Sequence, residues 1–290
     1  MSRIGRFHSD ALIAFVPLHA ACLLLLWTPF KWSYLAWLVA TYSIRMFAIT
    51  GGYHRYFAHR SFKLDRVSQF VMAFLAQSSA QMGVLWWGAH HRTHHRYSDT
   101  GEDLHSPVIR GFWYSHIGWI IAGSSSEYDR RVIQDFAKFP ELRILDKYHR
   151  APAILFGAAI FAAGGYGVFL WGFVLSTVLL WHCTFSINSL AHLWGSRSFE
   201  TGDHSRNNLF LALITLGEGW HNNHHQFMCS ARQGLRWWEI DITYYVLRSL
   251  SLVGIVRELR APNPSSIFRV RTSIDVGDPL ILKPKRSPYG

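Results

Sequence analysis

Four apolar stretches limit what this chain can fold into. They cover residues 11–27, 32–50, 151–165 and 168–187, and they are nearly free of charged side chains. A helix needs about 20 apolar residues to cross the hydrocarbon core of a bilayer, so these stretches predict membrane-spanning helices. The third stretch is short, and we expect its helix to begin earlier, within the preceding "LDKYH".

Short connections join these stretches in pairs. A few residues around Lys31 join the first two, and "GGYG" joins the last two. Nearly all other Lys and Arg residues lie at the N-terminus, in residues 51–150 or after residue 195. Such basic segments stay on the cytoplasmic side of a membrane. The sequence therefore predicts an all-α integral membrane protein with four transmembrane helices in two hairpins and both termini in the cytoplasm.

The composition agrees with a membrane protein. Half of the 290 residues are hydrophobic and only 16% are charged, whereas about a quarter of a soluble domain is charged. The net charge of +11 suits either nucleic acid or an anionic lipid surface, and the apolar content favours lipid. We therefore expect membrane lipids, and no nucleic acid, among the partners. The three cysteines form no disulfide framework or CxxC motif.

The remaining segments are expected to lie in the cytoplasm. Residues 51–150 and 188–264 are expected to form a helical cap, which completes one domain over residues 1–264, and residues 265–290 form a polar tail. Residues 66–87 are apolar but carry several Gln and Ser residues, and we expect one helix that lies against the membrane or the protein. Arg45, inside the second stretch, is expected to extend its charged end to the nearer membrane surface.

Three histidine clusters lie in the predicted cap. The segment "HNNHH" repeats the spacing of "HRTHH", and residues i, i+3 and i+4 share one face of a helix. A further cluster, "HRYFAH", follows the second apolar stretch, and "NSLAH" follows the fourth. The candidate metal ligands are His54, His59, His91, His94, His95, His192, His221, His224 and His225.

These histidines predict a site for two metal ions. Neutral imidazole is the commonest metal ligand, and a tetrahedral zinc ion takes four ligands, so nine candidates suit two ions. Imidazole alone does not choose among Zn, Cu, Fe and Ni. His54 and His59 lie about 140° apart around a regular helix, so the helix must end or distort between them. Acids that can hold the second ring nitrogen of a ligand are Glu218, Asp99, Asp103, Glu102 and Asp203.

The clusters resemble the histidine boxes of a known family. "HRYFAH", "HRTHH" and "GEGWHNNHH", with "NSLAH" between the last two, resemble membrane fatty acid desaturases, in particular the stearoyl-CoA desaturase branch. "LHSP" and "GFWYSHIGW" resemble that branch as well, and the likeness covers roughly residues 35–245. The resemblance implies a di-iron centre with two ions per chain. One iron would be held by His54, His59, His91, His95 and His224, and the other by His94, His192, His221 and His225, with Asn188 reaching it through water.

The resemblance also implies a reaction and a substrate. An unactivated methylene has no acidic proton, so its oxidation needs O2 and a redox metal. The family introduces a cis double bond into a saturated acyl chain such as that of acyl-CoA. It uses two electrons from a separate donor, such as a ferredoxin or a b-type cytochrome with its reductase. Trp87, Gln81 and Thr184 match residues that line the family's bent acyl tunnel, and Tyr42 and Met46 match its closed end.

Departures from the family leave some alternatives open. Ala89 and His90 replace a charged pair of the animal members, and "IAGSSSEYD" replaces a basic segment that helps to hold coenzyme A. Coenzyme A, an acyl carrier protein and an intact lipid therefore all remain candidate carriers, and the same centre also allows hydroxylation. A haem or metal transport protein fits less well, because the apolar stretches hold only His19 and His182 and no acid. A zinc hydrolase also fits less well, because the histidine motifs lack the HExxH-type general base that such an enzyme needs.

Overall fold

The computed structural model describes residues 9–122, 127–263, 265 and 267 of the 290 residues. Over this part of the chain the regular structure is helical, and no strand forms. Isolated bridges link Lys63 to Arg257, and Asn207 to both Ser196 and Trp220. The prediction of an all-α chain is confirmed for these residues. The predicted polar tail, 265–290, lies almost wholly outside the described residues.

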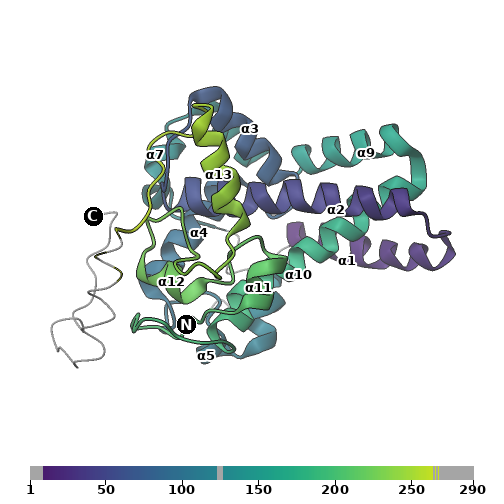
Figure 1. The fold of residues 1–290 in the computed structure, drawn as a ribbon. Coiled ribbons are helices and arrows are strands. Elements are labelled where there is room, and N and C mark those ends of the chain that lie inside the picture. Colours follow the sequence, from purple (N-terminus) through teal and green to yellow (C-terminus); the bar gives the residue numbers. More distant parts are fainter. Residues whose placement is uncertain (1–8, 123–126, 264, 266, 268–290) are drawn as a thin grey trace.

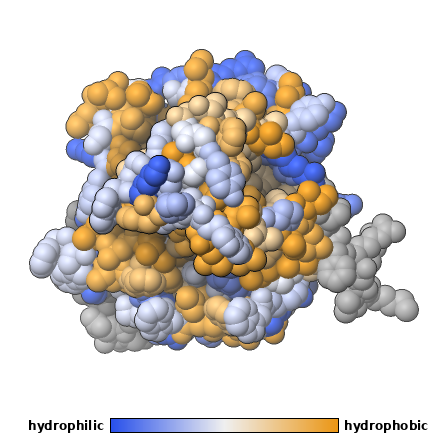
Figure 2. Space-filling view, turned by 90° about the vertical axis from the view of Figure 1, so that its right-hand side faces the viewer, coloured by the Kyte–Doolittle hydropathy of each residue, from blue (hydrophilic) through white to orange (hydrophobic). Residues whose placement is uncertain are grey.

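The helices form two regions. The long apolar helices α1 (Ser9–Cys22), α2 (Trp32–Phe47) and α9 (Ala151–Phe169), with η1 (Leu23–Trp27) and η6 (Leu170–Leu175), extend to one side (Figure 1). Apolar side chains cover much of the face to which they point (Figure 2). The remaining elements are η2 (Ala48–Ala58), α3 (Arg66–Gln77), α4 (Val84–Tyr97), α5 (Pro107–Arg110), η3 (Tyr114–Gly118), α6 (Trp119–Ile121), η5 (Arg130–Ile133), α7 (Gln134–Ala137), α8 (Pro140–Lys147), α10 (Ser176–Ser189), η7 (Leu190–His192), α11 (Leu209–Ile214), α12 (His221–Gln226) and α13 (Ile242–Leu252).

One helical stretch among the described residues, Ala151–His192, is long and apolar enough to cross a membrane. This stretch is not straight, because at Gly165 the backbone takes φ 70° and ψ −162° and the chain turns back (Figure 1). Gly157 of α9 then lies against the ring of Phe173 in η6, so the two arms pack together. The predicted connection "GGYG" is therefore the turn of a helical hairpin. Leu12–Trp27 forms a shorter apolar helix.

Replacing Gly165 by alanine should destabilise this hairpin. The φ, ψ pair at Gly165 is one that glycine alone adopts readily, and another residue there costs about 1–3 kcal/mol. Purified Gly165→Ala protein should therefore unfold several degrees below the wild type in a thermal scan followed by tryptophan fluorescence. Gly101→Ala is the control, because a methyl group there meets nothing within 4 Å. Equal midpoints for both variants would contradict the role assigned to Gly165.

The second apolar helix continues beyond its predicted end at residue 50. α2 passes directly into η2, a π-helix that runs from Ala48 to Ala58. In a π-helix residues five apart bond to each other, and the amide of His59 donates to the carbonyl of His54 at 3.1 Å. The distortion predicted between these two histidines is confirmed. It brings their rings to within 4.8 Å, centroid to centroid.

Arg45 does not reach the membrane surface, so that expectation is wrong. Its side chain is fully buried, and its guanidinium donates to the hydroxyls of Ser176 and Thr177 at 2.5 and 2.7 Å. The rings of Phe156 and Phe173 lie 5.0 and 5.5 Å from it. The hydroxyls of α10 replace water as acceptors for the cation, and Arg45 thereby joins α2 to α10.

Two further predicted boundaries are wrong. Residues 66–87 form two helices, because the backbone has positive φ at Ala80 and Met82 and turns between α3 and α4. The start of α4 is held by Asp146, which accepts from two of its first amides. The third apolar helix does not begin within "LDKYH", which belongs to α8 and the turn that follows. Pro152 in its first turn is typical of a helix start.

Candidate metal centre

The nine candidate histidines gather in two compact groups. Within each group, one ring nitrogen of every residue lies within 4.8 Å of the corresponding atom of every other member. The membership is the same as that of the two ligand sets implied by the resemblance, although metal binding itself stays a prediction. The first group is His54, His59, His91, His95 and His224, and the second is His94, His192, His221 and His225.

Hydrogen bonds alone do not explain the arrangement of the Nε2 atoms in the first group. His224 Nε2 lies 3.0 Å from the Nε2 atoms of both His54 and His95, and His91 Nε2 lies 3.0 Å from that of His95 and 2.9 Å from that of His59. A ring nitrogen of neutral imidazole carries one hydrogen or one lone pair, so it cannot bond two such neighbours at once. Two nitrogens about 2.1 Å from one ion and about 90° apart lie about 3.0 Å from each other, so a cation satisfies this arrangement.

Carboxylates fix three of the four rings in the second group. Asp99 accepts from Nδ1 of His192 at 2.8 Å, and Asp203 accepts from Nδ1 of His225 at 2.7 Å. Asp103 accepts from Nδ1 of His94 at 3.1 Å. An Nδ1–H that donates to a carboxylate leaves the lone pair on Nε2, which is the arrangement found around metal-bound histidines.

Each HxxHH helix supplies ligands to both groups. In α4, His91 and His95 face the first group and His94 faces the second. In α12 the division is reversed, since His224 faces the first group and the i, i+4 pair His221 and His225 faces the second. The groups are adjacent, because the rings of His95 and His225 are only 4.4 Å apart.

Glu218 connects the first group to a buried ion-pair network. It accepts from Nδ1 of His54 and from Arg55 at 3.1 Å, and Arg55 also donates to Asp241 at 2.9 Å. Burial alone would raise the pKa of the Glu218 carboxyl, but interactions with His54 and Arg55 outweigh it and lower that pKa. Arg55 is fully buried in η2, so the π-helix that carries His54 is anchored beneath the ligands.

Burial keeps ligands of the first group neutral. It lowers the pKa of His59, His91 and His95 well below the usual value, and the neighbouring imidazoles lower it further. Burial would raise the pKa of Asp203, but His225 and nearby hydroxyls hold it well below its usual range. At neutral pH these three imidazoles are therefore neutral and the Asp203 carboxyl is ionised, and these are the protonation states in which such groups bind a metal ion.

The other predicted site residues lie outside the two histidine groups. Asn188 lies at the end of α10 and borders two cavities, whereas the hydroxyl of Tyr42 donates to the carbonyl of Ile214 and Tyr42 borders neither of them. Glu102 is exposed to solvent. The sequence analysis missed His105, which groups with His94 and Asp103 and is buried. The segment "LHSP" was the only signal of its position.

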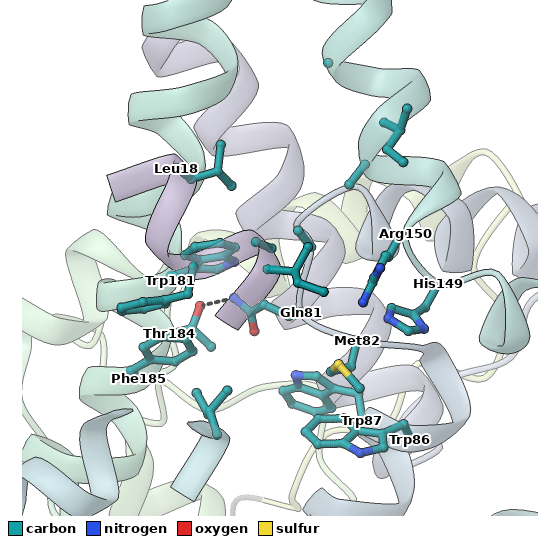
Figure 3. A pocket seen from close by; sticks show the side chains of 18 of the residues that line it. Leu18, Gln81, Met82, Trp86, Trp87, His149, Arg150, Trp181, Thr184 and Phe185 are labelled. Atoms are coloured by element: carbon teal, nitrogen blue, oxygen red, sulfur yellow. Dashed lines mark hydrogen bonds between the residues drawn. The ribbon is translucent and has the colours of Figure 1, made fainter. Parts of the chain in front are cut away.

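A cavity of about 530 Å³ reaches the first group of histidines. His91 and Asn188 border it, as do Gln81, Trp87 and Thr184 (Figure 3). The side-chain amide of Gln81 donates to the hydroxyl of Thr184 at 3.2 Å. The ring of Trp87 stacks between those of Tyr53 and His91, at 5.3 and 5.0 Å. The cavity wall next to the candidate metal ligands is therefore held by ordered side chains.

A smaller cavity of about 30 Å³ adjoins the large one, because Trp87 and Thr184 border both cavities. Met46, Ile49 and Thr50 line it, and Met46 is fully buried. Of the two residues expected at the closed end of the tunnel, Met46 is therefore next to a cavity and Tyr42 is not.

Comparison with known proteins identifies the class of this chain. The family model described as fatty acid desaturase matches residues 9–252. The acyl-CoA C20 Delta5-desaturase of Anemone leveillei is 38% identical over 85% of this chain and 80% of its own length. The sn-1 stearoyl-lipid 9-desaturase of Anabaena variabilis is 36% identical over 87% of this chain and 90% of its own length. The Delta-9 acyl-lipid desaturase 1 of Arabidopsis thaliana is 37% identical over 90% of this chain and 87% of its own length.

These matches and the all-helical, histidine-rich fold define an enzyme, an oxidoreductase that acts on fatty acyl chains. The chain belongs to the fatty acid desaturase family. Its resemblance to that family, inferred above from the histidine boxes, is confirmed.

The carboxylate behind His225 should strengthen metal binding. Removing the charge of Asp203 in Asp203→Asn keeps an acceptor oxygen but should weaken metal affinity by about 10–100-fold. To test this, each variant is equilibrated with chelators of increasing strength. The metal that it retains is then measured by elemental mass spectrometry. Glu102→Gln, which changes an exposed acid, should retain metal like the wild type. Equal retention by both variants would show that Asp203 does not support the site.

Proposed function

We propose that this enzyme introduces a cis double bond into a saturated fatty acyl chain at a di-iron centre on the cytoplasmic side of a membrane. The observation that carries this proposal is the position of the large cavity. It is lined largely by apolar side chains and reaches His91 of the first histidine group and Asn188. An acyl chain in this cavity would place a methylene group next to the metal ions.

The nine histidines fit two iron ions. The first ion would be held by His54, His59, His91, His95 and His224, and the second by His94, His192, His221, His225 and a water on Asn188. When bound, two iron ions supply the redox chemistry with O2 that an unactivated C–H bond requires. Imidazole also suits other metals, and the choice of iron rests on this chemical requirement and on the family.

The overall reaction balances with two electrons and two protons. R–CH2–CH2–R′, O2, two electrons and two protons give R–CH=CH–R′ and two molecules of water. The electrons would come from a separate protein, such as a ferredoxin or a b-type cytochrome with its reductase. The chain's own residues bind and orient the substrate, and their apolar side chains exclude water from the reacting carbons.

The bound acyl chain would bend where it passes Trp87, Gln81 and Thr184. The hydrogen bond between Gln81 and Thr184 closes one side of the cavity, and the stacked ring of Trp87 closes another. An acyl chain bent around these side chains would hold two neighbouring carbons in an eclipsed arrangement, which favours a cis product.

The proposal includes four transmembrane helices in two hairpins. α1 with η1 and then α2 would form one hairpin, and α9 with η6 and α10 the other, with the cap, the histidines and both termini in the cytoplasm. The domain would extend over residues 1–264. This topology rests on the apolar stretches and on the distribution of basic residues in the sequence.

Expression in a host that lacks its own desaturase tests the activity. Unsaturated acyl chains should appear with the wild type and should be absent with His94→Ala, because the second metal ion would lose one of its four imidazoles. Glu102→Gln should retain activity, and membrane fractions should contain all three proteins. Full activity of His94→Ala, or hydroxylated chains as the sole product by mass spectrometry, would contradict the proposal.

Met46→Ala should shift the product profile toward longer acyl chains. The fully buried Met46 side chain borders the small cavity, and its removal would deepen the closed end of the tunnel. Met72→Ala is the matched control, because it removes the same side chain from a buried position beside Gly52 that borders neither cavity. Acyl chains from cells that express each variant would be compared by gas chromatography. An unchanged profile for Met46→Ala would remove Met46 from the tunnel.

A further inference from the structure

The large cavity extends well beyond the histidines along a single helix. Phe169 and Phe173 of the η6 arm line it, and so do Trp181, Thr184 and Asn188 of α10. At about 1.5 Å per residue, these positions cover on the order of 25 Å of helix. One end of the cavity therefore lies beside the candidate metal ligands, and the other lies among the long apolar helices.

Two helices form the walls of this outer part. Ile13, Ala14 and Leu18 of α1 line it, and Ile154 and Ala158 of α9 line it as well. Both helices pack against η6. On α1, Nε2 of His19 lies 3.0 Å from Nε2 of His182, which ties α1 to α10 (compare Leu18 and Trp181 in Figure 3). The outer cavity is thus the groove between α1 and α9, with the η6 arm as its floor.

The mouth of the groove opens on an apolar surface. Ile13 and Ile154 border the cavity and are nevertheless 58% and 66% exposed. Their neighbours Val16 and Leu155 are both 57% exposed. Apolar side chains that are exposed on helices of a membrane enzyme face lipid rather than water, so the groove opens into the bilayer.

A basic rim lies at the cytoplasmic end of the same groove. His149 and Arg150 immediately precede α9 and border the cavity, and Arg150 is exposed (Figure 3). A cation just before a membrane-spanning helix would lie among lipid head groups, where it would attract phosphate. The groove would therefore combine an apolar channel with a positive charge at the depth of the lipid phosphate.

The position of the small cavity fixes the direction of the chain. Every residue that lines it is buried or half-buried, so it is the closed end of the tunnel and would hold the methyl end of a substrate. The carboxyl end must then leave through the large cavity. The outer part of that cavity leads to the groove between α1 and α9, where an ester would lie at the membrane surface.

We infer that the substrate is an acyl chain of an intact membrane glycerolipid, which enters sideways through this groove. We define the lipid portal as Ile13, Ala14, Ile154 and Ala158, the residues of α1 and α9 that border the mouth. The inference rests on the proposed function, because it assigns the substrate class to the same centre. The relatives named above include both acyl-CoA and acyl-lipid desaturases, so the comparisons do not decide between the two carriers.

Photo-crosslinking in lipid nanodiscs tests the portal without requiring catalysis. The probe is a phosphatidylcholine with a diazirine at mid-chain. It should label peptides that contain Trp87 or Thr184 in the wild type. In Ala158→Trp, a bulky ring fills the portal and labelling should fall at least fivefold. Ala159→Trp is the matched control, because Ala159 is exposed on the same helix and does not border the cavity. Metal content and a single size-exclusion peak should be the same for all three proteins.

A second pair of variants guards against misfolding. Ala14→Trp narrows the portal from the α1 side, and Ala20→Trp, an exposed position of α1 outside the cavity, is its control. Labelling that persists in both portal variants would overturn the inference. Labelling by a diazirine acyl-CoA but not by the lipid probe would overturn it too, and would leave desaturation intact.

Product analysis in the same nanodiscs, supplied with a chemical reductant, separates the two proposals. If the wild type yields desaturated phosphatidylcholine and the portal variants do not, both desaturation and entry through the portal are supported. Wild-type labelling that is blocked in the portal variants, with no unsaturated product, supports the portal and counts against desaturation.

Discussion

The closeness of nine imidazole nitrogens is the constraint on which the rest of the structure depends. Nε2 atoms of the first group lie 3.0 Å apart, and a positive ion between them would satisfy their lone pairs. Four of the rings are held by acids at Nδ1, which are Asp99, Asp103, Asp203 and Glu218. Those acids are buried in turn, and the structure accommodates one of them with a buried cation, Arg55. The interior of the cap is therefore a hydrogen-bonded network built outward from the two groups of ligands.

The same constraint explains the irregular helices around the centre. A regular helix would place His54 and His59 on different faces, and the π-helix η2 places them together. α12 has only six residues, yet Asn222 and Asn223 hold it on both sides. The amide of Asn222 bonds to the loop at Phe199, and that of Asn223 bonds to Glu239 at 2.9 Å. Local helical stability is low in such short elements, so contacts between distant segments of the chain have to keep the ligands in position.

What could be predicted depended on how local each signal was. The histidine boxes repeat a helical spacing within a few residues, and they indicated both the ligand set and the distortion between His54 and His59. Arg45 was misjudged because its hydroxyl partners are more than 130 residues away in α10. The hydrogen-bonded chain from His19 through His182 to His116 was missed for the same reason, since each histidine stands alone in the sequence. The positive φ values between α3 and α4 fall at Ala80 and Met82 and not at a glycine, so Gly83, which precedes α4, was the one weak sign of this break in the sequence.

The hairpin turn at Gly165 has a consequence for the lipid around the enzyme. From Ala151 to Gly164, α9 has 14 residues before the turn. Its length is about 21 Å, whereas the hydrocarbon core of a typical bilayer is about 30 Å thick. As a membrane span, a helix of this length would impose hydrophobic mismatch, and the neighbouring lipids would thin locally. That deformation would be centred on α9, so the lipids beside the portal would already be displaced from their ordinary packing.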